Sequence, residues 1–285
     1  MIKEWLSSYE ASNQEEYKDA LREVMQEIAL AGLYRSGFFE KAAFYGGTAL
    51  RIFHGLKRYS EDLDFTLLEV NPSFSLEKYQ EAIIVEFAAL GMTVTIKEKE
   101  KRTKSPIHSA FLKSETIWKE LVLEGVLPQN GLQQVAQLKI KIEVDTEPPL
   151  GFSTEERLLV KPFSFYVKCL VLQDLFAGKM HALLFRKWGK NVKGRDWYDM
   201  EWYIKNNVSL NLSHFILRAK DSGNWDSETM TKEQLLQLLA ERIDTVNMNY
   251  VKNDIERFIS TPQEIAIWSS NYFHDLIRLL KISTS

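Results

Sequence analysis

The chain has 285 residues, of which 45% are hydrophobic and 26% charged, the balance of a globular protein with one or two cores. Its formal net charge of −3 excludes a global positive field, so a nucleic acid would have to meet a local basic patch. The single cysteine, Cys169, excludes an internal disulfide and fits a reducing compartment. No apolar run approaches the length of a membrane span, and the N-terminal segment lacks the apolar stretch of a signal peptide. We therefore expect a cytoplasmic protein that does not contact a membrane.

Helix and strand patterns alternate in the first part of the chain. Apolar positions at helical spacing predict helices over 15–32, ending at Gly32, and over 76–90, with a short helix at 48–54. Short buried or alternating runs predict strands at 42–45, 63–70, 92–97 and 108–113. This mixture indicates an α/β region.

The strand predicted at 137–145 has the most regular alternation in the chain. One face is apolar and the other polar, as expected for a strand that is buried on one side only. The apolar positions are Leu138, Ile140, Ile142 and Val144, and the polar ones are Lys139, Lys141, Glu143 and Asp145. Two prolines, Pro148 and Pro149, end the strand.

The pattern becomes helical after about Pro162. Helices are predicted at 165–188, 196–206, 231–243, 250–260 and 264–281. We therefore predict an α+β protein with two domains: residues 1–162, a mixed sheet flanked by helices, and residues 163–285, a helical bundle.

Two aspartates, Asp62 and Asp64, lie one residue apart within an apolar run. In a strand they share a face, about 7 Å apart at the backbone. Like charges held so close are costly unless a cation neutralises them, and hard oxygen ligands select Mg²⁺ or Mn²⁺. The alternative is a solvated strand end. The context favours a metal that carries substrate phosphates.

That context is a Gly46-Gly47 pair between the predicted strand at 42–45 and the helix that follows. Backbone N–H groups at such a turn, together with the helix dipole, bind phosphate. Thr48 adds a hydroxyl at the start of the helix. A simple tight turn explains the glycines alone, but not their arrangement with the aspartates.

The stretch GGTALRIFHGLKRYSEDLDF resembles the first motif of the nucleotidyltransferase superfamily that includes DNA polymerase beta. In particular it resembles the AbiEii/AbiGii branch, toxins of bacterial abortive-infection toxin–antitoxin pairs. The resemblance implies that Asp62 and Asp64 hold the metal that carries a nucleoside triphosphate. It also implies that Gly47 and Thr48 contact the triphosphate, and that Arg58 and Ser60 line the same pocket.

The superfamily usually adds a third carboxylate from a neighbouring strand, which completes a metal site or acts as a base toward the acceptor hydroxyl. The polar face at 137–145 offers Glu143 and Asp145. Glu143 is favoured because it lies nearer the middle of the strand. A solvated face, with Lys139 and Lys141 as ion partners, is the alternative.

Two later stretches, FAGKMHAL and KGRDWYDM, also resemble the toxin branch. The resemblance implies a phosphate-binding Lys179 and a required aspartate, for which Asp196 is our first choice and Asp199 the second. If 165–188 is one helix, Lys179 and Arg186 share a face and both reach toward phosphate. Asp196 is also placed to cap the helix that follows.

Residues 186–195 are rich in lysine and arginine, which indicates either a solvated loop or an anchor for an RNA backbone. The aromatic residues nearby are expected to pack the helical part, with base stacking as the alternative. They are Trp188, Trp197, Tyr198 and Trp202. His181 is expected to be a packed or capping histidine.

The sequence thus predicts a magnesium-dependent (or manganese-dependent) nucleotidyltransferase that moves a nucleoside monophosphate from an NTP to an acceptor hydroxyl. The resemblance suggests an RNA acceptor, such as a tRNA 3′ end. It also suggests a separately encoded antitoxin, often a winged-helix regulator, that forms no tight complex with the toxin. Two alternatives keep the fold: transfer to an aminoglycoside-like small molecule or a protein side chain, and a catalytically inactive binding protein.

Overall fold

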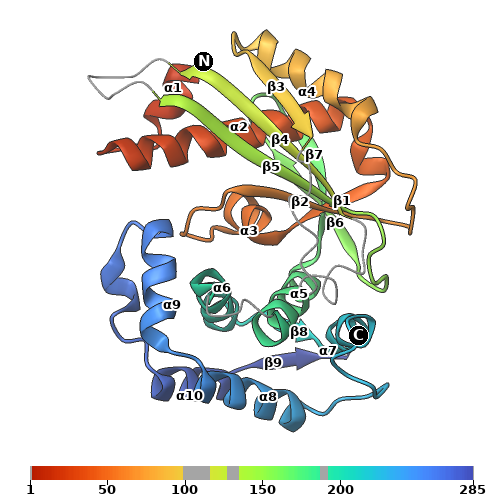
Figure 1. The fold of residues 1–285 in the computed structure, drawn as a ribbon, viewed down its shortest axis with the longest axis vertical. Helices are drawn as coiled ribbons and strands as arrows, with labels where there is room; N and C mark the ends of the chain where they lie inside the picture. The colour runs from red at the N-terminus through yellow and green to blue at the C-terminus, as the bar shows by residue number, and fades with distance from the viewer. Residues whose placement is uncertain (1, 99–115, 127–134, 187–191, 285) are drawn as a thin grey trace. The chain divides into compact units, whose positions relative to one another are not determined.

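The computed structural model describes residues 2–98, 116–126, 135–186 and 192–284 (Figure 1). The chain forms two compact units, which are described separately. Unit 1 comprises Met1–Phe53, Ser60–Pro148 and Thr154–Cys169, and unit 2 comprises His54–Tyr59, Pro149–Ser153 and Leu170–Ser285. Unit 1 therefore continues beyond Pro162 to Cys169, and two short earlier segments belong to unit 2.

Unit 1 is built on a mixed sheet, with the described strands in the order β3-β4-β5-β2-β1-β7-β6. β2 pairs antiparallel with β1 and parallel with β5, so it lies inside the sheet. The bounds are β1 (Ala42–Tyr45), β2 (Asp62–Leu67), β3 (Val94–Glu98), β4 (Thr116–Val126), β5 (Val135–Asp145), β6 (Thr154–Leu159) and β7 (Phe165–Leu170). The strands predicted near residues 42, 63, 92 and 137 are confirmed, while 108–113 lies outside the described residues.

Helices cover one face of this sheet (Figure 1). They are α1 (Ile2–Ser7), α2 (Gln14–Arg35), a 3-10 turn (Phe38–Glu40), α3 (Gly46–His54) and α4 (Glu77–Ala89). The apolar sides of β2 and β5 join residues of α2 and α4 in one core, in which Leu63, Phe65 and Ile142 are fully buried. Burial of one face leaves the other available for polar groups.

Gly32 does not end α2, which corrects the sequence expectation. It lies inside the helix, where a Cβ would come 2.6 Å from the Cα of Ile83 on α4. The glycine therefore permits close approach of two helices. The helix continues to Arg35, and the backbone N–H of Ser36 bonds the carbonyl of Gly32 at 3.2 Å.

Unit 2 is mostly helical, and its described parts include a two-stranded parallel sheet. Its elements are α5 (Leu172–Phe185), α6 (Gly194–Lys205), β8 (Ser209–Asn211), α7 (Leu212–Asp221), α8 (Lys232–Thr245), α9 (Met248–Ile255), 3-10 turns (Glu256–Phe258 and Pro262–Ile265), α10 (Ser270–Arg278) and β9 (Lys281–Ser283). The prediction of one helix over 165–188 is wrong, because its first part is β7. The predicted helix at 264–281 is also divided, and α7 was missed.

The predicted fold class is confirmed: a mixed α+β sheet flanked by helices, followed by a largely helical part. In the portion of the chain that the structure describes, no helix is both long and apolar enough to cross a membrane.

Candidate active site

Asp62 and Asp64 lie on the face of β2 that α2 and α4 do not cover. Both are partly exposed, whereas Leu63 and Phe65 between and after them are fully buried. The alternation follows from the two-residue period of a strand. The predicted pair of carboxylates on one face is therefore present.

Glu143 lies beside Asp64 in the neighbouring strand. In the parallel ladder of β2 and β5, Asp64 pairs with Glu143, whereas Asp145 pairs with Thr66. Partners in register point to the same face of a sheet. Glu143 forms an ion pair with Lys141, which itself stands beside Asp62. The register thus puts Glu143, rather than Asp145, nearest the two aspartates.

Gly46 is required by both its backbone and its neighbour. Its φ is +86°, a conformation that side chains disfavour, and a Cβ there would overlap the Asp64 carboxylate, with the Asp64 Cγ at 3.2 Å. The first N–H groups of α3 begin at this glycine and have no partners within the helix. The turn therefore brings the start of α3 close to the Asp64 carboxylate of β2.

Thr48 makes a structural contact within unit 1, and its expected triphosphate contact stays a prediction. It is fully buried, and its hydroxyl donates a hydrogen bond to the backbone carbonyl of Asp62. The bond ties the first turn of α3 to the start of β2. The buried Gly47 lies between these contacts.

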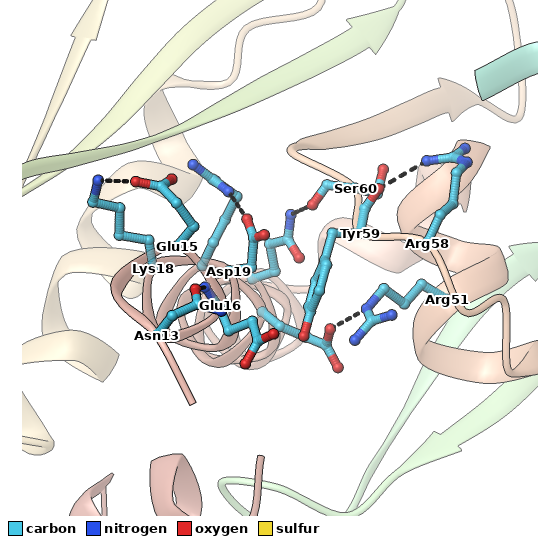
Figure 2. Close-up of polar contacts among 12 residues, drawn as sticks. Asn13, Glu15, Glu16, Lys18, Asp19, Arg51, Arg58, Tyr59 and Ser60 are labelled. Carbon is cyan, nitrogen blue, oxygen red and sulfur yellow. Dashed lines mark hydrogen bonds and ion pairs between the residues drawn. The ribbon is translucent and has the colours of Figure 1, made fainter. Parts of the chain in front are cut away.

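Two polar residues of α2 hold the segments around Gly46 and β2 in place, and the sequence patterns did not predict either of them. The Gln26 amide, 1% exposed, donates to the backbone carbonyl of Ser60 at 3.0 Å. Glu23 forms an ion pair with Arg51 of α3 (Figure 2). The sequence feature that could have indicated this contact is a glutamine, Gln26, among the apolar positions of α2. Ser60 is thus held through its backbone two residues before β2 begins.

A divalent cation suits this donor set only in part. Among the residues that the structure describes, no three His, Cys, Asp or Glu side chains are grouped closely enough to hold a metal ion. The expected three-carboxylate group is therefore not preformed, and Glu143 is paired with Lys141 instead. Magnesium, however, commonly takes one or two carboxylates and completes its shell with water and substrate phosphate. Asp62 and Asp64 fit that requirement.

Unit 2 holds a second cluster, centred on the buried Asp199 of α6. Arg58 bonds both carboxylate oxygens, with Nε–Oδ1 at 2.6 Å and Nη2–Oδ2 at 2.7 Å. Arg58 is 1% exposed and also donates to the Tyr59 carbonyl at 3.0 Å (Figure 2). The Arg58 guanidinium is therefore engaged in the protein interior, which argues against its expected place in a triphosphate pocket.

Lys179 of α5 completes this cluster. Its Nζ lies 2.7 Å from Asp199 Oδ2 and 3.7 Å from Asp196 Oδ1. Burial alone would raise the pKa of Asp199, but the Arg58 guanidinium and the Lys179 ammonium lower it to about 2. Desolvation opposes the charge of Arg58, yet its pKa is raised by Asp199. Asp199 and Arg58 are consequently both ionised at neutral pH.

The start of α6 is capped from another helix. Asp254 of α9 accepts a hydrogen bond from the Gly194 N–H at 2.8 Å, and a Cβ on Gly194 would overlap the Val251 carbonyl. Asp196 is not the cap, since it lies inside the first turn and is 6% exposed. The prediction of a capping role is wrong.

Arg186 does not extend the face of α5. It follows the last helical residue, with an extended backbone at ψ 121°, so it does not continue the helical spacing from Lys179. Half of the basic stretch at 186–195, residues 187–191 with Trp188 among them, lies outside the described residues. The packing roles predicted for His181, Trp197 and Tyr198 are confirmed by their burial, and His181 bonds Ser222 at 2.8 Å.

The mixed sheet, the glycine turn and the paired aspartates are the features of a nucleotidyltransferase. The family model described as "Nucleotidyl transferase AbiEii toxin, Type IV TA system" matches residues 12–274, and the chain belongs to this family. The family description implies a toxin with a separate antitoxin as its partner.

Two solved structures from Helicobacter pylori resemble the chain. JHP933 aligns with a TM-score of 0.53 and 15% identity, over 94% of this chain and 93% of that one. A putative nucleotidyltransferase aligns with a TM-score of 0.46 and 15% identity, over 90% and 91% of the two chains. At 15% identity, the similarity to JHP933 shows that the two chains share a fold. No curated protein sequence matches the chain.

Proposed function

We propose that this toxin transfers a nucleoside monophosphate from an NTP to an RNA hydroxyl, with Mg²⁺ (or Mn²⁺) as cofactor and the 3′ end of a tRNA as acceptor. The observation that carries the proposal is the β2–β5 register, in which Asp62 and Asp64 share a sheet face with Glu143. The Gly46 turn against Asp64 supports it. The choice of RNA rests on the resemblance of the motifs to the toxin branch.

In this proposal the acceptor oxygen bonds the α-phosphorus while the bond from that phosphorus to the bridging oxygen breaks, and pyrophosphate leaves. Asp62 and Asp64 hold the cation, which when bound neutralises triphosphate charge. Glu143 accepts the proton of the acceptor hydroxyl once its ion pair with Lys141 loosens. The Lys179 ammonium offsets charge on the leaving pyrophosphate.

The proposed setting is the cytoplasm, with an antitoxin that does not form a tight complex. Toxicity then depends on how much acceptor RNA is modified. Expression of the wild-type chain is accordingly expected to arrest growth.

The test incubates the purified protein with each α-labelled NTP, Mg²⁺ and total tRNA, then separates RNA, protein and small molecules. We expect label in the tRNA, and none with Asp62→Asn. Glu69→Gln is the matched control, since Glu69 is an exposed carboxylate just past β2. Equal labelling by Asp62→Asn and wild type would overturn the metal assignment. Label that appears only in protein or in an added aminoglycoside would overturn the RNA acceptor.

A further inference from the structure

We propose that Arg58 and Asp199 are positioning residues that direct the Lys179 ammonium, and that they do not touch the nucleotide. This inference rests on the proposed function for its consequence in transfer, but its geometry stands on unit 2 alone. All three residues belong to that unit. Arg58 lies on the short segment His54–Tyr59, which belongs to unit 2. The rest of the Gly-Gly and Asp62/Asp64 motif belongs to unit 1.

The segment that carries Arg58 is itself anchored. The Tyr59 N–H donates to the Phe258 carbonyl at 2.8 Å, and Lys57 lies 3.9 Å from a carboxylate oxygen of Glu264. The Arg58 guanidinium then meets Asp199 with two parallel bonds, the arrangement that restricts a carboxylate most strongly. Asp199 is thereby fixed in both position and orientation.

Exposure differs sharply within the cluster. Asp199 is fully buried and Arg58 is 1% exposed, whereas the Lys179 side chain is 19% exposed. Only Lys179 of the three reaches solvent, where a ligand can meet it. The two buried members can act on a ligand only through Lys179.

Charge balance also favours a positioning role. Arg58 already neutralises Asp199 through both oxygens, and Lys179 contacts Oδ2 of the same carboxylate at 2.7 Å. The remaining carboxylate near Lys179 is Asp196 at 3.7 Å, a longer contact. The ammonium is therefore held in one place, and because the Lys179 side chain is 19% exposed, a phosphate can reach it there. A flexible lysine would otherwise lose side-chain entropy on binding.

Helix α6 offers a matched control. Glu201 is also buried, at 6% exposure, and its carboxylate lies 2.7 Å from Lys205 Nζ. It accepts hydrogen bonds from Trp268 and Tyr272, which are packing residues of unit 2. Glu201→Gln therefore removes the same charge as Asp199→Asn, next to a different lysine.

The first experiment measures acetylation of single lysines by an N-hydroxysuccinimide ester, with peptide mass spectrometry and a thermal melt of every variant. We expect Asp199→Asn and Arg58→Lys to raise the labelling rate of Lys179 several-fold and leave Lys205 unchanged. Glu201→Gln should instead raise the labelling rate of Lys205 and leave that of Lys179 unchanged. No turnover is needed, so this arm decides the positioning even if the wild type transfers no nucleotide. An unchanged Lys179 rate in folded Arg58→Lys would overturn the proposal, and Arg58→Lys serves where Asp199→Asn fails to fold.

The second experiment is a double-mutant cycle on transfer. Arg58→Lys should lower kcat/KM about 10- to 100-fold in the wild-type background, as expected for a misplaced group. In a Lys179→Ala background the same change should cost less than about twofold, because Arg58 acts through Lys179. Additive losses would show that Arg58 acts independently, which overturns the inference while leaving the proposed transfer intact.

Discussion

Asp64 and Glu143 stand side by side in adjacent parallel strands, and each is flanked along its strand by buried apolar residues. The ladder therefore points both carboxylates to the face of the sheet that α2 and α4 leave uncovered. Asp145 shares that face but lies two residue pairs further along, beside Thr66. This difference of two residue pairs separates the two candidates for the third carboxylate.

We expect Glu143→Gln to lower nucleotide transfer about 100-fold, the usual size of a general-base contribution, and Asp145→Asn to lower it less than about tenfold. Both variants remove one negative charge from β5, so each controls for the other. Initial rates of label transfer to tRNA measure the effect. The opposite order of losses would assign the role to Asp145.

Gly46→Ala should damage both stability and activity. The added methyl group meets the Asp64 carboxylate, and the positive φ of +86° costs a further 1–2 kcal/mol or so. Gly55→Ala is the control, since its φ is +75° but nothing lies within 4 Å of the added Cβ. Denaturant unfolding should show about 1 kcal/mol lost at Gly55 and clearly more at Gly46. Equal losses would mean that Asp64 does not exclude a side chain at position 46.

Acid should weaken the buried cluster of unit 2. The pKa of Asp199 is about 2 in the folded protein, below its value of 3.8 in the unfolded chain. The folded state thus holds its charge at lower pH, so this stability is present above about pH 4 and is lost as pH falls toward 2. Urea unfolding between pH 5 and 3 should show a loss on the order of 1–2 kcal/mol. Asp199→Asn should be less stable throughout and flatter across that range, and parallel curves would contradict the assignment.

Glu27 of α2 should make the protein less stable as the pH rises, which is the opposite of the effect expected from Asp199. Burial, with repulsion from Glu23, raises its pKa from 4.5 to about 8, and Lys161 opposes this only in part. The folded protein therefore holds a proton that the unfolded chain releases, and stability falls as pH rises from about 4.5 to 8. We expect Glu27→Gln to be more stable than wild type at pH 8, by about 1 kcal/mol or more. Glu15→Gln, at an exposed site of the same helix, should change little.

Tyr203 has a buried hydroxyl that finds no hydrogen-bond partner within the described part of the chain. Its ring stacks on Phe176 with centroids 4.3 Å apart, and that packing survives loss of the hydroxyl. We expect Tyr203→Phe to leave stability unchanged or to raise it by up to about 1 kcal/mol. Tyr272→Phe should instead cost about 1 kcal/mol, because it removes a hydrogen bond to Glu201. Thermal melts of the two variants provide the comparison.

Local patterns in the sequence were sufficient for the carboxylate strand and its neighbour. The two-residue period of β2 and β5 is a property of the backbone, so it placed Asp62, Asp64 and Glu143 on polar faces without a structure. The run at 165–170 was misread for a related reason, because a short apolar run fits a buried strand and a helix equally well.

The sequence by itself determined which face each strand residue takes and which family motifs the chain carries. The tertiary structure decided the partners. Arg58 and Asp199 are 141 residues apart, and no periodicity connects them. The Thr48 hydroxyl, expected at a phosphate, meets the Asp62 carbonyl because chain packing brings the start of α3 against β2. Side-chain direction follows from local geometry, whereas the group that a side chain meets depends on how distant segments pack.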